Sequence, residues 1–284
     1  MAKGVALTIG LNSVDPAHYQ GWSGELVACE ADARDMAQIA KSRGFTVNTL
    51  LTKSANRGAA IQAIQSSAES LVAGDIFMLS YSGHGGQLPD LNGDEDDGED
   101  ETWCLFDGEL VDDELYAALA AFATGVRVLV FSDSCHSGTV VKLAFYAAPG
   151  DQSHAARAAR GFDANASTRF RVMPPPVALR TYQANQGMYD EILKNKALRN
   201  AAEKVQASVL LVSGCQDNQL SADGTFNGLF TGTLKQVWNG GKFRGGYRTF
   251  RKRIVNRMPP DQTPNYFTIG APNAQFEAQR PFTI

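Results

Sequence analysis

Two segments of the sequence place a thiol and an imidazole where chemistry is expected. Residues 127 to 138 read R-V-L-V-F-S-D-S-C-H-S-G, and residues 75 to 86 read D-I-F-M-L-S-Y-S-G-H-G-G. Each segment begins as an apolar run, typical of a strand buried on both faces, and ends in small and polar residues. Functional groups of α/β proteins lie where such strands end. We therefore predict that Cys135 and His84 meet at one edge of a sheet.

The pair of Cys135 and His84 is suited to acyl transfer. An imidazole that takes the thiol proton lowers the thiol pKa and generates a nucleophile. Glycines on both sides of His84 leave backbone amides free to stabilise an oxyanion. A single cysteine is more often a buried core thiol, so the hypothesis depends on both residues following glycine-rich strand ends. His136 is the rival base, but strand alternation turns it away from Cys135.

The alternation of side chains along a strand also predicts the neighbours of this pair. Asp133 shares a face with Cys135, whereas Ser134 points the other way. Ser82 likewise shares a face with His84. A carboxylate and a hydroxyl are therefore expected beside the thiol and the imidazole.

The rest of the chain alternates strands with helices, which predicts a parallel sheet with right-handed crossovers and helices on both faces. We expect an α/β fold, a three-layer α-β-α sandwich with a mostly parallel central sheet. Further strands are predicted over residues 4–11, 45–51, 209–213 and 266–269, and helices over residues 26–43, 57–73, 110–122, 229–238 and 247–257.

The length and composition fit one large domain. The 284 residues are 44% hydrophobic and can bury a sizeable core, so we predict a single domain over residues 1–284. Residues 140–206 lose the strand and helix rhythm and hold a run of three prolines. We expect them to be an irregular insertion between the two halves of the domain, helical from Tyr189 to Val205.

Charge, hydropathy and cysteine spacing exclude several classes of protein. The net charge is −4 without a basic stripe, so nucleic acid is a poor candidate for a partner. No apolar run approaches membrane-spanning length, and residues 1–10 lack the features of a signal peptide, which predicts a cytoplasmic protein. The four cysteines show no CxxC spacing, which favours free thiols over disulfides or a zinc site.

An acidic run, D-L-N-G-D-E-D-D-G-E-D-E, covers residues 90–101. It is either a solvated loop or a cation site. An EF-hand is rejected because Glu95 occupies the glycine position and a strand, not a helix, precedes the run. Asp112, Asp113 and Glu114 open a predicted helix, where acids commonly act in capping.

Several motifs together resemble those of metacaspases, the caspase-like cysteine peptidases of bacteria, plants, fungi and protists. They occur in the order and spacing of that family and cover most of residues 3–240 outside the insertion. The motifs are L-V-A-C-E-A-D-A-R-D-M (26–36), Y-S-G-H-G-G-Q (81–87), G-D-E-D-D-G-E-D-E (93–101), D-D-E (112–114), D-S-C-H-S-G (133–138) and S-G-C-Q-D-N-Q-L-S-A-D (213–223).

The resemblance implies a caspase-haemoglobinase fold and assigns the catalytic roles. Cys135 would be the nucleophile, His84 the general base and acid, and the Gly85 amide part of the oxyanion hole. Metacaspases usually lack the caspase dimer, so the resemblance also implies a monomer.

The resemblance further implies cleavage of protein or peptide substrates after Arg or Lys. Asp133 would repel a thiolate on its own face unless a substrate cation neutralised it. By the family pattern Asp32 joins Asp133, and Ser82 and Cys29 line the pocket. Two carboxylates around one guanidinium account for a preference for Arg.

Many metacaspases bind calcium through carboxylates that match Asp100, Asp112 and Asp113. A further aspartate of the family, seven residues after the nucleophile, is replaced here by Lys142. The exchange of an anion for a cation weakens a calcium site. We therefore expect that no cofactor is required, and that Lys142→Asp would create calcium dependence.

Three alternatives remain open from the sequence. The chain could be an inactive caspase-like scaffold or interaction module, although neither the dyad nor the pocket acids are lost. It could be a caspase-fold cysteine peptidase with non-basic specificity, against which Asp32 and Asp133 argue. A metal-dependent hydrolase is disfavoured, since no histidine lies among the carboxylates of the acidic run.

A basic specificity has one consequence for the chain itself. The insertion contains arginines that the enzyme could cut, as happens in some relatives. The candidates are Arg169, Arg171 and Arg180.

Overall fold

The structure is a computed structural model and describes residues 2–93, 98–134, 170–214, 223–224, 226–260 and 262–284. Within these residues a central sheet of six strands has the order β2-β1-β3-β7-β8-β9. The first five strands are parallel, and β9 is antiparallel to β8. The strands are β1 (Gly4–Gly10), β2 (Thr46–Leu51), β3 (Ile76–Ser82), β7 (Arg127–Asp133), β8 (Ser208–Ser213) and β9 (Asn265–Gly270).

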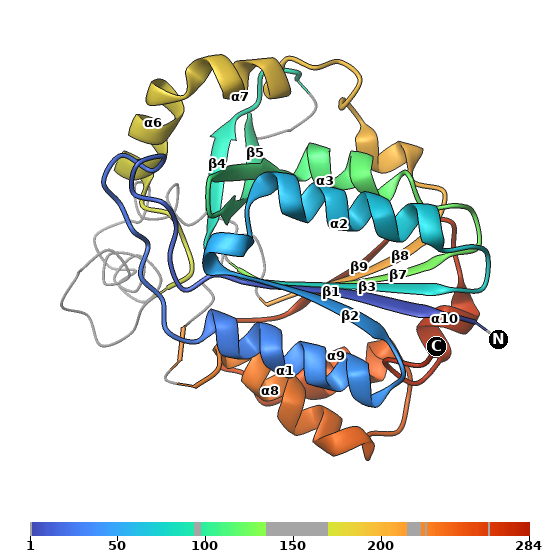
Figure 1. The fold of residues 1–284 in the computed structure, drawn as a ribbon. Coiled ribbons are helices and arrows are strands. Elements are labelled where there is room, and N and C mark those ends of the chain that lie inside the picture. The colour runs from blue at the N-terminus through green and yellow to red at the C-terminus, as the bar shows by residue number, and fades with distance from the viewer. Residues whose placement is uncertain (1, 94–97, 135–169, 215–222, 225, 261) are drawn as a thin grey trace.

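Helices cover both faces of this sheet (Figure 1). On one face lie α2 (Arg57–Ser70) and α3 (Asp112–Leu119), and on the other lie α1 (Cys29–Ser42), α8 (Leu229–Trp238) and α9 (Tyr247–Val255). The short α10 (Ala274–Ala278) follows β9. This arrangement confirms the predicted three-layer α/β sandwich.

Each face of the sheet has its own hydrophobic core, because strands buried on both sides present alternate side chains to opposite faces. Every residue of β3 is buried. Phe77 of β3 faces the core under α2 and α3, where its ring stacks on Phe122 at 4.9 Å between centroids. Met78 faces the other core, which includes Phe230 of α8 and Phe250 of α9.

A second, antiparallel sheet was not predicted. It comprises β4 (Gly85–Pro89), β5 (Glu99–Leu105) and β6 (Gly108–Val111), in the order β4-β5-β6. The pattern of a half-buried strand is hidden by the glycines and proline of β4 and by the acidic start of β5. The acidic run, predicted to be either a solvated loop or a cation site, therefore ends inside a strand. The helix predicted from Leu110 begins only at Asp112.

The predicted insertion is more regular than expected in its described part. Two helices, α6 (Pro175–Ala184) and α7 (Gln186–Leu193), lie beside β4 and β5 (Figure 1). The prediction of one helix from Tyr189 to Val205 was wrong, since α7 ends at Leu193 and a 3₁₀ turn follows at Ala201–Lys204. The prolines initiate α6, because proline is favoured in the first turn of a helix.

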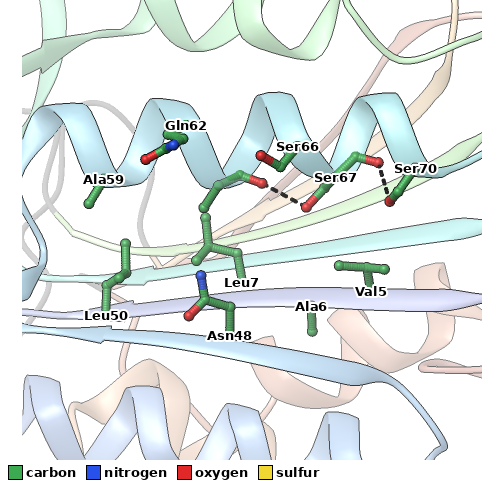
Figure 2. A pocket seen from close by; sticks show the side chains of 11 residues that line it. Val5, Ala6, Leu7, Asn48, Leu50, Ala59, Gln62, Ser66, Ser67 and Ser70 are labelled. Atoms are coloured by element: carbon green, nitrogen blue, oxygen red, sulfur yellow. Dashed lines mark hydrogen bonds between the residues drawn. The ribbon is translucent and has the colours of Figure 1, made fainter.

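A surface groove of about 430 Å³ runs between α2 and strands β1 and β2 (Figure 2). Side chains from α2, including Gln62 and Ser66, form one wall, and Leu7, Asn48 and Leu50 form the other. None of its lining side chains is ionisable, and the groove does not include the strand ends that carry the predicted chemistry. No helix in the described part of the chain is long and apolar enough to span a membrane.

Candidate active site

The two segments that carry the predicted chemistry end side by side. Strands β3 and β7 are parallel neighbours, and their register pairs Ser82 with Asp133. The carboxyl ends of both strands therefore open at the same edge of the sheet, as predicted. The predicted nucleophile Cys135, together with His136 and Lys142, lies outside the described residues.

The His84 ring is buried and held in one orientation. Its Nε2 lies 3.0 Å from the carbonyl oxygen of Gly24. A carbonyl only accepts hydrogen bonds, so Nε2 carries the proton and Nδ1 is the basic nitrogen. The Trp22 ring packs against the imidazole with 4.7 Å between ring centroids. The segment between β1 and α1 therefore fixes the tautomer and the orientation of His84.

The environment of His84 keeps the imidazole neutral. Burial lowers its pKa to about 4, and this effect exceeds the opposing influences of the Gly24 carbonyl and the Asp223 charge. The Val172 backbone also raises the pKa of His84, although Nδ1 has no hydrogen bond of normal geometry to any described residue. A neutral imidazole with a free Nδ1 can accept a proton.

The backbone of His84 is anchored from the core. Its carbonyl accepts hydrogen bonds from the Tyr81 hydroxyl at 2.7 Å and from the Cys104 amide at 2.9 Å. The Tyr81 ring is stacked on Trp103 of β5, with 4.4 Å between centroids. This anchor was missed from the sequence because it depends on β5, which was not predicted as a strand.

A buried acidic pocket lies beside His84. The Ser82 hydroxyl is 2.9 Å from Asp32 Oδ2, so the start of α1 meets the end of β3. Asp32 and Asp133 are fully buried, which excludes the ordinary role of a solvated acid for Asp32. The guanidinium of Arg171 joins the two acids, with Nη2 at 2.7 Å from Asp32 and Nη1 at 3.0 Å from Asp133.

Asp223 is a third carboxylate of the pocket. Its Oδ1 lies 3.1 Å from Arg171 Nη2, and its Oδ2 accepts a hydrogen bond from the Val27 amide. The residue was not assigned to the pocket from the sequence, although it closes the motif that follows β8. Because β8 is the neighbour of β7 in the sheet, a polar residue after β8 is expected near Asp133.

The charges of the pocket depend on one another. Burial alone would lower the pKa of Arg171, but the carboxylates of Asp133, Asp32 and Asp223 raise it well above its usual value. Burial raises the pKa of Asp32, and Arg171 opposes that rise. Arg171 therefore stays protonated in the pocket. Without its guanidinium the three buried acids would face each other with no counter-ion.

Residues outside the predicted set hold the acids in place. Thr231 donates from its hydroxyl, at 2.7 Å, and from its amide to Asp133 Oδ2. The Asn227 side chain, at 2.8 Å, and the Gly228 amide donate to Asp32. A Cβ atom on Gly228 would lie 2.4 Å from Arg171 Nη2, so only glycine permits this approach of the backbone to the guanidinium.

Cys29 lines the same pocket as an uncharged thiol. It is completely buried, and burial raises its pKa to about 12 despite the opposing charge of Arg171. The predicted set of Asp32, Asp133, Ser82 and Cys29 is thus brought together around one guanidinium.

The backbone of Arg171 is bound next to the imidazole. The Gly85 amide donates to the Arg171 carbonyl oxygen at 3.0 Å, and the Met173 amide donates to the Gly85 carbonyl oxygen at 2.8 Å. These two bonds form a parallel bridge between Gly85 and Val172. An amide next to His84 that points at a carbonyl oxygen has the arrangement of an oxyanion-hole donor.

The predicted metal ligands lie away from this pocket. Asp100 is buried in β5, and Asp112 and Asp113 begin α3, which directly follows β6. The Asn92 side chain donates to Asp113 Oδ2 at 2.8 Å. Within the described ranges, no group of three or more His, Cys, Asp or Glu side chains is arranged to hold a metal ion. The expectation that no calcium is required, made from Lys142, stays a prediction.

Comparison with known proteins places the chain in a family. The sequence pattern of the family described as Caspase domain matches residues 3–276. The chain belongs to the caspase-domain family. The metacaspase resemblance is confirmed by metacaspase-1 of Mycosarcoma maydis, 31% identical over 81% of this chain, and metacaspase-1 of Pyricularia oryzae, 32% identical over 90%. The chain spans 60% and 66% of the lengths of these two relatives.

Solved structures agree with this assignment. The crystal structure of protein GSU0716 from Geobacter sulfurreducens is 60% identical, with a TM-score of 0.87, and the match covers 99% of this chain and 98% of that one. Caspase-1 from Spodoptera frugiperda shares the fold at 14% identity, with a TM-score of 0.52 over 94% of this chain and 86% of that one. The caspase-domain fold predicted from the motifs is therefore confirmed.

Proposed function

We propose that this caspase-domain protein is a cysteine endopeptidase that cleaves protein or peptide substrates after Arg or Lys. Cys135 is the nucleophile, His84 Nδ1 exchanges the proton, and the Gly85 amide stabilises the oxyanion of the tetrahedral intermediate. One observation carries the specificity: a fully buried guanidinium is bound by Asp32, Asp133 and Asp223 in a pocket beside His84.

The pocket chemistry favours Arg over Lys and excludes Asp. Arg171 Nη1 and Nη2 reach different acids, and Nη1 also contacts the Ser82 hydroxyl at 2.8 Å. A planar guanidinium can make all these contacts at once, whereas an ammonium group cannot span them. An acidic side chain would add a fourth buried negative charge.

The test is hydrolysis of fluorogenic peptides that differ only in Arg, Lys or Asp at the position before the scissile bond. We expect cleavage after Arg, weaker cleavage after Lys and none after Asp, with all activity lost in Cys135→Ala. Each assay is run with calcium and with chelator, and we expect the rate to persist in chelator. Cleavage after Asp, or activity in Cys135→Ala, would contradict the proposal.

A pocket variant adds a quantitative arm. Asp32→Asn removes one charge-assisted contact, which is typically worth about 1.5–3 kcal/mol, so kcat/KM for the Arg peptide should fall roughly 10- to 100-fold. Glu30→Gln is the matched control, because Glu30 lies on the same helix but pairs with the exposed Arg34. Equal losses in both variants would show that the effect comes from α1 and not from the pocket.

A further inference from the structure

Three arginines from distant parts of the chain lie together on the far side of the molecule from the candidate active site. Arg43 follows α1, Arg244 lies between α8 and α9, and Arg280 follows α10. Helices α1 and α8 both begin at the acidic pocket and end near the starts of the parallel strands, where α10 lies (Figure 1). We propose that these three arginines, the arginine cluster, form an anion site that binds a phosphate group. The inference does not depend on the proposed peptidase activity.

Two guanidinium groups of the cluster share one carbonyl oxygen. The oxygen of Phe243 accepts from Arg280 Nε at 3.1 Å and from Arg244 Nη1 at 3.2 Å. The Arg280 guanidinium also lies over the Trp238 ring, 5.2 Å from its centroid, in the position of a cation–π contact. Both arginine side chains are therefore held in fixed orientations, with their positive charges next to one atom.

Arg43 joins the cluster through the C-terminal segment. Its Nε donates to the Phe282 carbonyl oxygen at 3.2 Å. Phe282 is fully buried and its amide donates to the Tyr247 hydroxyl at 3.1 Å, so the segment that follows Arg280 is fixed in place. Reduced solvation lowers the pKa of Arg280, and the charges of Arg244 and Arg43 lower it further, as expected for three neighbouring cations.

The charges of the cluster have no counter-ion among the described residues. None of the three arginines forms an ion pair with an acid in that part of the chain, and Glu277 of α10 pairs with Arg248 instead, at 2.6 Å. The backbone oxygens that hold the arginines carry only partial negative charge. A single cation is enough to cap the end of a helix such as α8. Three cations from separate segments therefore repel one another, and a bound anion relieves that repulsion.

The free donors of the cluster fit the oxygens of a phosphate. Arg43 and Arg280 each use Nε for a carbonyl oxygen, and their Nη groups donate no hydrogen bond to a described residue. Guanidinium groups bind phosphate oxygens through pairs of parallel hydrogen bonds. A phosphate monoester carries about −1.5 to −2 charge on three acceptor oxygens, whereas a carboxylate carries a single charge on two. A phosphate group is therefore the anion that best matches three arginines.

The surface around the cluster is basic as well. Residues 224–260 contain eight Lys and Arg but no Asp or Glu, although the net charge of the chain is −4. This basic stripe was not predicted from the sequence, because the buried positions of α9 interrupt it. Arg253 of α9 lies over the Phe243 ring, 5.2 Å from its centroid, and brings a fourth guanidinium next to the cluster. Such a concentration of one charge attracts anions to this face.

The first experiment measures the affinity for free phosphate groups. Inorganic phosphate and pyrophosphate are titrated into wild type and variants by calorimetry, at constant ionic strength set with chloride. Arg280→Gln and Arg43→Gln lie in different segments, and each should raise the Kd for pyrophosphate at least about 10-fold. Arg257→Gln is the matched control, because Arg257 belongs to the same basic stripe but donates only to the Arg253 carbonyl oxygen. It should leave the Kd nearly unchanged.

The second experiment distinguishes a lipid-borne phosphate from a free one. Wild type and Arg280→Gln are sedimented with phosphatidylcholine vesicles that contain phosphatidic acid, a phosphate monoester, or the same fraction of phosphatidylglycerol, a phosphodiester. Arg280-dependent binding to phosphatidic acid alone, without binding of free pyrophosphate, assigns the site to a lipid head group. Arg280-dependent binding of pyrophosphate, without a preference among vesicles, assigns it to a soluble phosphate compound.

The remaining outcomes overturn the proposal. They are the absence of binding to every probe, binding that does not depend on Arg280 and Arg43, and an equal loss in Arg257→Gln. The Tm of each variant in chloride buffer reports whether it is folded. Arg280→Lys is the variant to use if Arg280→Gln does not fold, since it keeps the charge over Trp238 but loses the paired Nη donors. An unchanged Kd in both folded Arg280→Lys and folded Arg43→Gln would also overturn the proposal.

Discussion

At the scale of single residues, burial has opposite consequences for ionisable groups with and without a counter-ion. Arg171 is completely buried but keeps its charge because carboxylates surround it. Glu109 of β6 is also completely buried, but its Oε2 accepts only from the Thr102 hydroxyl, at 2.6 Å, and its Oε1 has no hydrogen-bond partner in the described residues. Burial raises the pKa of Glu109 to about 8.

Glu109 makes folding stability depend on pH. The ordinary pKa of a glutamate is 4.5, whereas the pKa of Glu109 in the folded protein is about 8, so between these values the folded state holds a proton that the unfolded state has lost. The free energy of unfolding is therefore highest below pH 4.5 as far as Glu109 is concerned, and this stability is lost as the pH rises toward 8. Glu109→Gln removes the dependence, and we expect Tm to rise by roughly 5 °C at pH 8 and to change little at pH 4.

Thermal unfolding of wild type and Glu109→Gln across pH 4 to 9 measures this effect. Glu203→Gln is the control, because Glu203 is exposed in a 3₁₀ turn. A Tm difference between Glu109→Gln and wild type that does not vary with pH would contradict the assignment of a protonated Glu109.

Pocket residues could be predicted from the sequence where they lie directly at the end of a predicted strand. Asp133 and Ser82 follow from strand alternation alone, whereas Asp32 and Cys29 required the metacaspase resemblance. Arg171 could be predicted as a cleavage candidate but not as the occupant of the pocket. Its place depends on a pairing with Gly85, 86 residues earlier in the chain, which no local pattern records.

At the scale of elements, the segment between β1 and α1 positions the imidazole without any regular secondary structure of its own. It supplies the Gly24 carbonyl to Nε2 and the Trp22 ring to the face of His84. It also donates the Val27 amide to Asp223. One segment thus touches both the proposed base and the proposed pocket.

Trp22 is expected to act as a positioning residue. Trp22→Ala admits water to His84, so we expect the His84 pKa to rise from about 4 toward 6.5. The acidic limb of the pH dependence of kcat should then shift to higher pH. We expect kcat to fall roughly 10-fold with KM little changed, because the acidic pocket is intact. Trp22→Phe should restore most of the rate.

Histidine NMR titration of Trp22→Ala provides a readout that general destabilisation would not move. The reference is wild type under the same conditions, with His18 as an internal comparison in each spectrum. An unchanged His84 titration in Trp22→Ala would remove the positioning role.

The predicted elements divide by the strength of their pattern. Strands β3 and β7 are continuous apolar runs, and the helices α1, α2 and α8 have periodic apolar positions, so all were predicted to within a few residues. The β4-β5-β6 sheet was missed because its strands mix glycine, proline and acids with the apolar positions. Its strands are defined by pairing with each other and not by local sequence.

At the scale of the whole molecule, the layer order could be predicted because alternating strands and helices have few ways to pack. The extent of the acidic pocket could not, since its acids come from α1, from β7 and from the chain after β8. These lie nearly 200 residues apart in sequence and meet only because the parallel strands end at one edge of the sheet (Figure 1).

The strand order has a consequence for a chain cut at any of the predicted cleavage candidates, Arg169, Arg171 or Arg180. The cut leaves β7 on the first fragment and β8 on the second, yet these strands are neighbours along six residues each in the middle of the sheet. The two fragments should therefore elute together in size exclusion and separate only in denaturant. Unfolding then becomes a dissociation, so the Tm of the cut protein should fall on dilution while that of Cys135→Ala stays constant.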